Sequence, residues 1–190
     1  MKQISVWSRK GGVGKSILSV NLAGYAFKNG LVPLIVDLDE QRTCMYIASK
    51  GKLPFVVVDE IPTKKPNCDV IIFDHPNSAA AKLYGTVIVP FRPVSSDFAS
   101  VSKNFAGIEE RGHNLVKVVS QGDQRVKDQR IRVASLQKQF GALRWSYRAA
   151  VQKAWSEFMP VLHPKIKRKT PILDAEFELE LMFKKAVGDV

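Results

Sequence analysis

Apolar and polar positions divide the first two thirds of the chain into short apolar runs separated by helix-like stretches. Five nearly continuous apolar runs are typical of strands covered on both faces. The Phe55–Val58 run predicts a further edge strand or part of a β-ribbon. Strands that alternate with helices in this way favour a parallel sheet with crossover helices. The five core strands are predicted at Gln3–Trp7, Val32–Val36, Val70–Phe73, Thr86–Pro90 and Leu115–Val119.

The stretches between the runs show the spacing of amphipathic helices. From Ser16 to Lys28, apolar side chains such as Leu18 and Leu22 share one face, and the pair Asn29-Gly30 supplies a stop. Further helices are predicted over residues 95–110, 126–140, 144–158 and 173–187. The pattern therefore predicts an α/β fold, with a mostly parallel twisted sheet, helices on both faces and one domain spanning residues 1–190.

A glycine-dense turn separates the first strand from the first helix, and residues 9–16 read Arg-Lys-Gly-Gly-Val-Gly-Lys-Ser. Glycines let backbone N–H groups converge on a small volume, and the following helix adds its positive end. Lys15 can neutralise phosphate charge, and the Ser16 hydroxyl can ligate Mg²⁺. We therefore expect the loop of a P-loop NTPase, with phosphate contacts from Gly11, Gly12, Val13, Gly14, Lys15, Ser16 and Ile17.

Carboxylates end two of the predicted strands. Asp37 and Asp39 follow the second run, and Asp74 ends the third. The carboxyl ends of neighbouring parallel strands open onto one crevice, so these side chains should face the phosphates. We predict Ser16, Asp37 and Asp74 as magnesium ligands, directly or through water. The three histidines have no triad or metal-binding companions in the sequence.

The phosphate loop departs from the ordinary pattern, because Arg9 replaces its first glycine and Lys10 follows. Lys-Gly-Gly-Val-Gly-Lys-Ser resembles the deviant Walker A loop of the ParA/MinD superfamily of dimerising ATPases. The resemblance implies ATP and Mg²⁺ as cofactors and a Lys10 that reaches the phosphates of a second subunit. It also implies catalytic roles for Lys15 and for Asp39, which would position the attacking water, although Glu40 replaces the usual proline.

The same resemblance extends to the predicted fourth and fifth strands. Residues 87–98 resemble the strand and proline-containing loop of small ParA proteins, particularly the short ParF-like plasmid partition branch. This resemblance implies that Pro90 and Arg92 lie near the adenine and the dimer face. Ser120 and Gln121 occupy the place where relatives contact the base. We therefore expect these four residues to belong to the nucleotide site.

The net charge of +11 is concentrated between residues 111 and 169, where Lys and Arg face only three acidic residues. A nucleotide needs few cations, so this region favours a second polyanion, interpreted as DNA, over a merely solvated basic face. Aromatic residues among these cations, such as Trp145 and Trp155, are more often core. The candidate DNA contacts are Arg144, Arg148, Lys165, Lys167, Arg168 and Lys169.

The resemblance implies an ATPase that dimerises with ATP, binds nucleoid DNA without sequence preference and drives plasmid or chromosome partition with a centromere-binding, ParB-like adaptor. One alternative is a relative that positions conjugation machinery or other cargo. A second is a MinD-like membrane factor, which the acidic first half of the last helix disfavours. A third is a module that holds ATP without hydrolysing it.

Location and oxidation state can also be anticipated. No apolar run is long enough for a membrane span, and no leader precedes the first strand, so we expect a cytoplasmic, nucleoid-associated protein without membrane contact. Because the first predicted strand begins at Gln3, we also expect no helix-turn-helix domain before it. Cys44 and Cys68 lack metal-ligand spacing and should be reduced, packed thiols.

Overall fold

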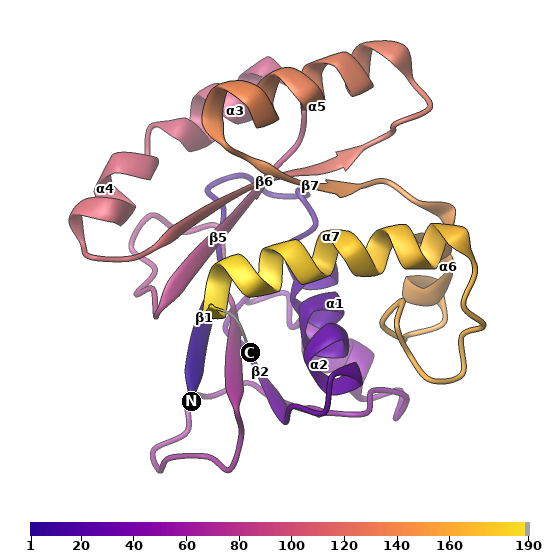
Figure 1. The fold of residues 1–190 in the computed structure, drawn as a ribbon. Coiled ribbons are helices and arrows are strands. Elements are labelled where there is room, and N and C mark those ends of the chain that lie inside the picture. The colour runs from indigo at the N-terminus through magenta and orange to yellow at the C-terminus, as the bar shows by residue number, and fades with distance from the viewer. Residues whose placement is uncertain (189–190) are drawn as a thin grey trace.

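The chain folds around a seven-stranded sheet, as seen in a computed structural model that describes residues 1–188 (Figure 1). All paired strands are parallel, and the strand order is β3-β2-β4-β1-β5-β6-β7. The predicted parallel α/β fold is therefore confirmed. The strands are β1 (Lys2–Val6), β2 (Pro33–Asp37), β3 (Val56–Val58), β4 (Val70–Asp74), β5 (Thr86–Phe91), β6 (Leu115–Gly122) and β7 (Leu143–Ser146).

Helices cover both faces of the sheet (Figure 1). On one face, α1 (Lys15–Lys28) and α7 (Thr170–Val187) pack on the central strands, with α2 (Thr43–Ala48) and α6 (Ala149–Ser156) beside them. On the other face lie α3 (Ser95–Ser102), α4 (Phe105–Glu110) and α5 (Lys127–Phe140). Each face of the sheet thus has its own apolar layer, which explains the continuous apolar strands.

Helix α1 connects the central strand β1 to β2, the strand next to the edge strand β3. Leu18 and Leu22 are fully buried, and burial of a leucine side chain contributes roughly 2 kcal/mol. The helix ends because Gly30 adopts a left-handed conformation with φ of 81°, and Leu31 N then donates to Ala26 O. The sequence predicted this helix and its stop correctly.

Two predicted elements need correction, and one element was missed. Residues 144–158 do not form one helix, because Leu143–Ser146 pairs with β6 as an edge strand and buries Trp145 before α6 begins. Residues 95–110 form two helices, α3 and α4, with Lys103 and Asn104 between them. Helix α2 was not anticipated. The Phe55–Val58 run contains an edge strand, β3, which was one of the two structures predicted for it.

No helix in the described part of the chain has the length and apolar character needed to cross a bilayer.

Candidate nucleotide-binding site

The glycine-dense loop lies between β1 and α1 at the carboxyl edge of the sheet. Gly12 and Gly14 have φ of 70° and 85°, in the left-handed region that side chains disfavour. A Cβ on Gly14 would lie 3.0 Å from Gln121 Nε2 and 3.1 Å from Ile17 Cγ2. The backbone conformation therefore favours glycine at position 14, and a Cβ there would also require the side chains of Gln121 and Ile17 to shift.

A cavity of about 520 Å³ opens above this loop. Its size is within the usual range for a small-molecule site. It is lined by Asp39 and, among the predicted phosphate and base contacts, by Gly11, Gly12, Gly14, Lys15, Ser16, Ile17 and Gln121. The structure thus brings together most of the predicted contacts from three separate segments of the chain.

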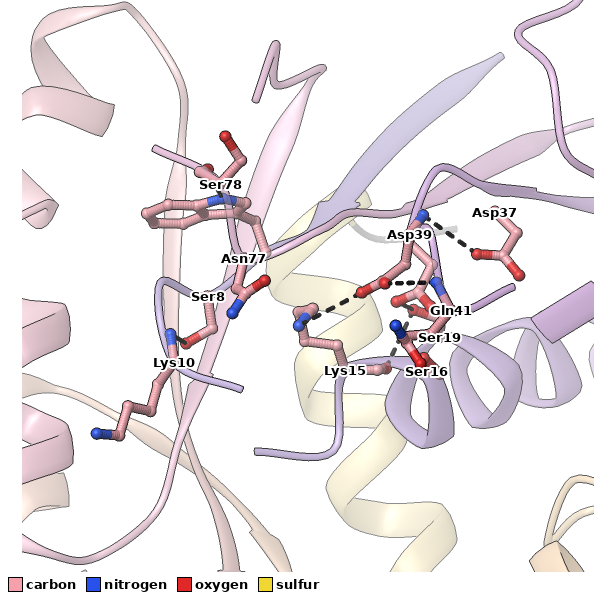
Figure 2. Close-up of polar contacts among 12 residues, drawn as sticks. Ser8, Lys10, Lys15, Ser16, Ser19, Asp37, Asp39, Gln41, Asn77 and Ser78 are labelled. Atoms are coloured by element: carbon pink, nitrogen blue, oxygen red, sulfur yellow. Dashed lines mark hydrogen bonds and ion pairs between the residues drawn. The ribbon is translucent and has the colours of Figure 1, made fainter. Parts of the chain in front are cut away.

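Lys15 and Asp39 face each other inside the cavity (Figure 2). Lys15 Nζ lies 3.8 Å from Asp39 Oδ2, and the lysine is only 8% exposed. Asp39 comes from the loop after β2, where its Oδ1 also accepts a hydrogen bond from Gln41 N. The pair places a cation and a carboxylate from different elements at one point beside the phosphate loop.

Asp74 ends β4 on the floor of the site and is fully buried. Ser19 Oγ donates to Asp74 Oδ1 at 2.9 Å. Burial raises the pKa of Asp74 to about 6, although a hydrogen bond from Ser16 opposes the shift.

A buried carboxylate beside a serine hydroxyl forms an oxygen-rich environment that suits Mg²⁺. No cluster of three or more His, Cys, Asp or Glu side chains within residues 1–188 could hold a metal alone. A magnesium ion here would therefore need oxygens from phosphate and water.

Asp37, the third predicted magnesium ligand, is buried and engaged by the backbone. Its Oδ2 accepts a hydrogen bond from Met45 N at 2.9 Å, and its Oδ1 accepts one from Asp39 N at 3.3 Å. Burial raises the pKa of Asp37 despite these bonds. Arg42 also donates from Nη1 to Asp37 O. In this arrangement Asp37 shapes the loop that presents Asp39, and its role as a magnesium ligand stays a prediction.

Cys44 lies next to the carboxylate floor. It is completely buried, and its Sγ lies 3.4 Å from Asp74 Oδ2. Both cysteines are free, and Cys68 is partly buried. Burial raises the pKa of the Cys44 thiol well above its usual range, which keeps the sulfur protonated and unreactive.

The predicted base contacts separate into two groups. Gln121 lines the cavity and donates from Nε2 to Gly12 O, whereas Ser120 is buried and donates from Oγ to Val13 O at 2.8 Å. Ser120 therefore supports the phosphate loop from below. Pro90 is buried within β5, and Arg92 follows that strand and pairs with Asp97. Neither of these two residues lines the cavity, and their predicted place near the adenine and the dimer face stays a prediction.

Five residues of the cavity wall were not among the predicted site residues, namely Gln41, Thr43, Asn77, Gln152 and Trp155, of which the last two lie on α6. Trp155 is partly buried, whereas Trp145 on β7 is core at 3% exposure. Nothing local in the sequence distinguishes the two tryptophans. Only the path of the chain after β7, which carries α6 back toward α1, places Trp155 at the site.

Lys10 does not point into the cavity. Figure 2 shows its ammonium group extending away from Lys15, on the opposite side of the loop. Lys10 Nζ lies 3.7 Å from Asp97 Oδ1 on α3, and the lysine side chain is 40% exposed. A lysine in this position is accessible from outside the molecule.

The basic residues proposed as DNA contacts have different environments. Arg148 is only 12% exposed and forms a two-point ion pair with buried Glu178, which Arg144 also contacts at 2.7 Å. Arg168 pairs with Glu176. Because Arg148 is largely buried and paired with Glu178, the structure does not support it as a DNA contact. Three exposed lysines form no ion pair within the described residues, and these are Lys165, Lys167 and Lys169.

The family comparison agrees with this geometry. Residues 4–144 match the model of the CobQ/CobB/MinD/ParA nucleotide binding domain. The chain belongs to this family. The match includes the phosphate loop, the Asp37–Asp39 segment and Asp74, and it confirms the ParA/MinD resemblance seen in the sequence. No curated protein sequence matches the chain significantly.

Solved structures of the ParA/MinD type share the fold over almost the whole chain. A putative plasmid partition protein from Borrelia burgdorferi bound to AMPPNP has a TM-score of 0.73 and 17% identity, with 97% of this chain and 99% of that chain covered. The MinC:MinD cell division protein complex from Aquifex aeolicus has a TM-score of 0.67 and 16% identity, with 95% of this chain and 96% of that chain covered. Pyrococcus horikoshii MinD with Mg-ADP has a TM-score of 0.65 and 17% identity, with 97% of this chain and 98% of that chain covered. At these identities the likeness establishes the fold.

Proposed function

We propose that this ParA/MinD-type chain is a Mg²⁺-dependent ATPase that dimerises with ATP, binds DNA without sequence preference and partitions plasmid or chromosomal DNA. The observation that carries the proposal is the placement of the two loop lysines. Lys15 faces Asp39 inside the cavity at 3.8 Å, whereas Lys10 lies outside it on the surface. This arrangement supports a role for Lys15 at the chain's own nucleotide and a role for Lys10 at a second subunit's nucleotide.

Binding of the triphosphate rests on the loop and on α1. Backbone N–H groups of residues 11–16 and the positive end of α1 converge on the phosphate position, and Lys15 neutralises charge there. Ser16 and Asp74 would hold Mg²⁺, and the ion would supply further neutralisation of phosphate charge. The structures with AMPPNP and Mg-ADP in two relatives support these ligands.

Hydrolysis requires a positioned water and little else, because phosphoryl transfer depends on alignment and charge stabilisation. Asp39 has the place and the chemistry for orienting that water, since its carboxylate lies at the cavity wall beside Lys15. His75 is not a candidate base. It is 1% exposed, its Nε2 contacts Ser5 Oγ, and burial lowers its pKa to about 4.

Dimerisation couples the nucleotide to DNA in this proposal. Two subunits joined through Lys10 would present two copies of the exposed lysines at 165, 167 and 169. Doubling the phosphate contacts raises affinity for a polyanion strongly and makes it salt dependent. A ParB-like adaptor that stimulates hydrolysis would then release the complex. A plasmid partition protein and MinD both occur among the structural relatives, so the preference for partition over the membrane alternative rests on the acidic first half of the last helix.

The proposal is tested by measuring binding to two unrelated DNA duplexes with ADP, ATP and AMPPNP over a salt series. We expect strong binding with ATP and AMPPNP only, equal for both duplexes and steeply reduced by salt. Lys15→Ala should abolish nucleotide binding and the nucleotide effect on DNA. DNA binding that is independent of nucleotide, or confined to one duplex, would contradict the proposal.

A further inference from the structure

Asp97 is a buried carboxylate that holds two exposed cations. It lies in the first turn of α3, and its side chain is 2% exposed. Arg92 Nε donates to its Oδ2 at 2.6 Å, and Lys10 Nζ lies 3.7 Å from its Oδ1. The phosphate loop of β1 and the loop after β5 are therefore joined to α3 through one acidic side chain.

The two cations are not held equally. Arg92 makes a short, charge-assisted hydrogen bond, whereas Lys10 at 3.7 Å makes an ion pair beyond hydrogen-bond distance. A buried carboxylate is costly when it has no partner. Because Arg92 would remain, Lys10 can leave Asp97 without stranding a buried negative charge. The same geometry gives the Lys10 ammonium a defined resting place outside its own cavity.

We propose that Asp97 is a positioning residue that holds Lys10 against α3 in the single subunit and releases it when a partner's phosphates are presented. This inference rests on the proposed role of Lys10 in dimerisation. The ion pair between Lys10 and Asp97 must be broken before Lys10 can contact the partner. This ion pair therefore lowers the affinity of dimerisation. Arg92 lowers that cost by neutralising Asp97 after Lys10 has left.

Two substitutions should shift dimerisation in opposite directions. Asp97→Asn removes the charge that holds Lys10, and we expect an AMPPNP-dependent dimer dissociation constant about threefold to tenfold lower than that of the wild type. Arg92→Gln leaves Lys10 as the only cation on Asp97, and we expect the constant to rise by about the same factor. Sedimentation equilibrium or mass photometry with Mg²⁺ and AMPPNP measures both.

Controls separate this role from a structural one. Glu180→Gln removes one carboxylate from an exposed pair with Lys184 on α7 and should leave dimerisation unchanged. AMPPNP affinity at concentrations below dimerisation should be the same in wild type and Asp97→Asn. In a Lys10→Ala background, which itself should fail to dimerise, Asp97→Asn should restore nothing, because its effect acts through Lys10.

The outcomes distinguish this inference from the proposed function. If Lys10→Ala abolishes dimerisation but Asp97→Asn weakens it or leaves it unchanged, the holding role of Asp97 is wrong and the function stands. Rescue of dimerisation by Asp97→Asn in the Lys10→Ala background would have the same meaning. If Lys10→Ala dimerises like the wild type, the proposed function fails as well. Should Asp97→Asn not fold, Arg92→Gln decides, and tighter or unchanged dimerisation in that variant overturns the inference.

Discussion

Gly14 is the residue of the phosphate loop with the least tolerance for a side chain. Its φ of 85° and the 3.0 Å contact that a Cβ would make with Gln121 both oppose substitution. We expect Gly14→Ala to weaken AMPPNP binding at least about tenfold, since strain of this kind costs about 1–3 kcal/mol. Gly107→Ala is the control, because Gly107 lies on α4 away from the cavity and its Cβ would meet nothing within 4 Å. Equal losses in the two variants by calorimetry would contradict this account.

Glu178 lies in a different part of the molecule, where it is buried and accepts hydrogen bonds from Arg148, Arg144 and Ser146. Burial alone would raise the pKa of Glu178, but the bonds from Arg148 and Ser146 outweigh it, so the pKa lies below the ordinary 4.5. A lowered folded-state pKa contributes stability above the unfolded value, and this stability is lost as the pH falls through the folded value.

Glu178→Gln should therefore lower the melting temperature at pH 7. The loss of charge pairing costs about 2 kcal/mol or more, which corresponds to roughly 4–8 °C for a chain of this size. The wild type should lose this advantage below about pH 4.5, where the two melting temperatures converge. Glu180→Gln, on the exposed face of α7, should behave like the wild type throughout. A constant difference between wild type and Glu178→Gln at every pH would refute the electrostatic explanation.

Individual site residues differ in how far the sequence could identify them. Lys15, Ser16 and Gly14 could be predicted because the loop's chemistry is local, and Asp39 could be placed because parallel strands end at one edge. Trp155 could not, since its position depends on how α6 returns to α1. Arg148 was misjudged for a related reason, because its partner Glu178 lies 30 residues away on α7.

At the scale of elements, the contact between α1 and the loop before α7 depends on a second glycine. A Cβ on Gly24 would lie 2.5 Å from Pro160 Cβ, and the same loop is anchored where Val161 N donates to Asn21 Oδ1. We expect Gly24→Ala to destabilise the protein by about 1–3 kcal/mol through overpacking. Gly107→Ala in α4 meets nothing within 4 Å and should instead stabilise by up to about 1 kcal/mol. Urea denaturation measures both variants, and the same sign for both would contradict the packing argument.

The elements also show where sequence patterns reach their limit. Core strands such as β2 and β4 were predictable because burial on both faces leaves a continuous apolar run. Strand β7 was not, because Leu143–Ser146 has only two buried positions and continues into residues with helical spacing. Its pairing with β6 is a long-range interaction that tertiary contacts impose over local preference.

For the whole molecule, the position of the unpaired lysines predicts how DNA is held. Lys165→Ala combined with Lys167→Ala should weaken binding to unrelated duplexes equally and reduce the salt slope by about two per subunit. Lys64→Ala combined with Lys65→Ala removes the same charge from an exposed loop on another part of the chain and should have little effect. Fluorescence anisotropy over a salt series measures both, and equal losses would indicate general charge attraction instead of a defined surface.

The central claim concerns the assembly of two chains around nucleotide, and the molar mass in solution tests it most directly. Light scattering should give the mass of one chain with Mg²⁺ and ADP and twice that mass with Mg²⁺ and AMPPNP. Lys10→Ala should keep the single-chain mass in both conditions while still binding AMPPNP. A wild-type protein that retains the mass of one chain when saturated with AMPPNP would contradict the account.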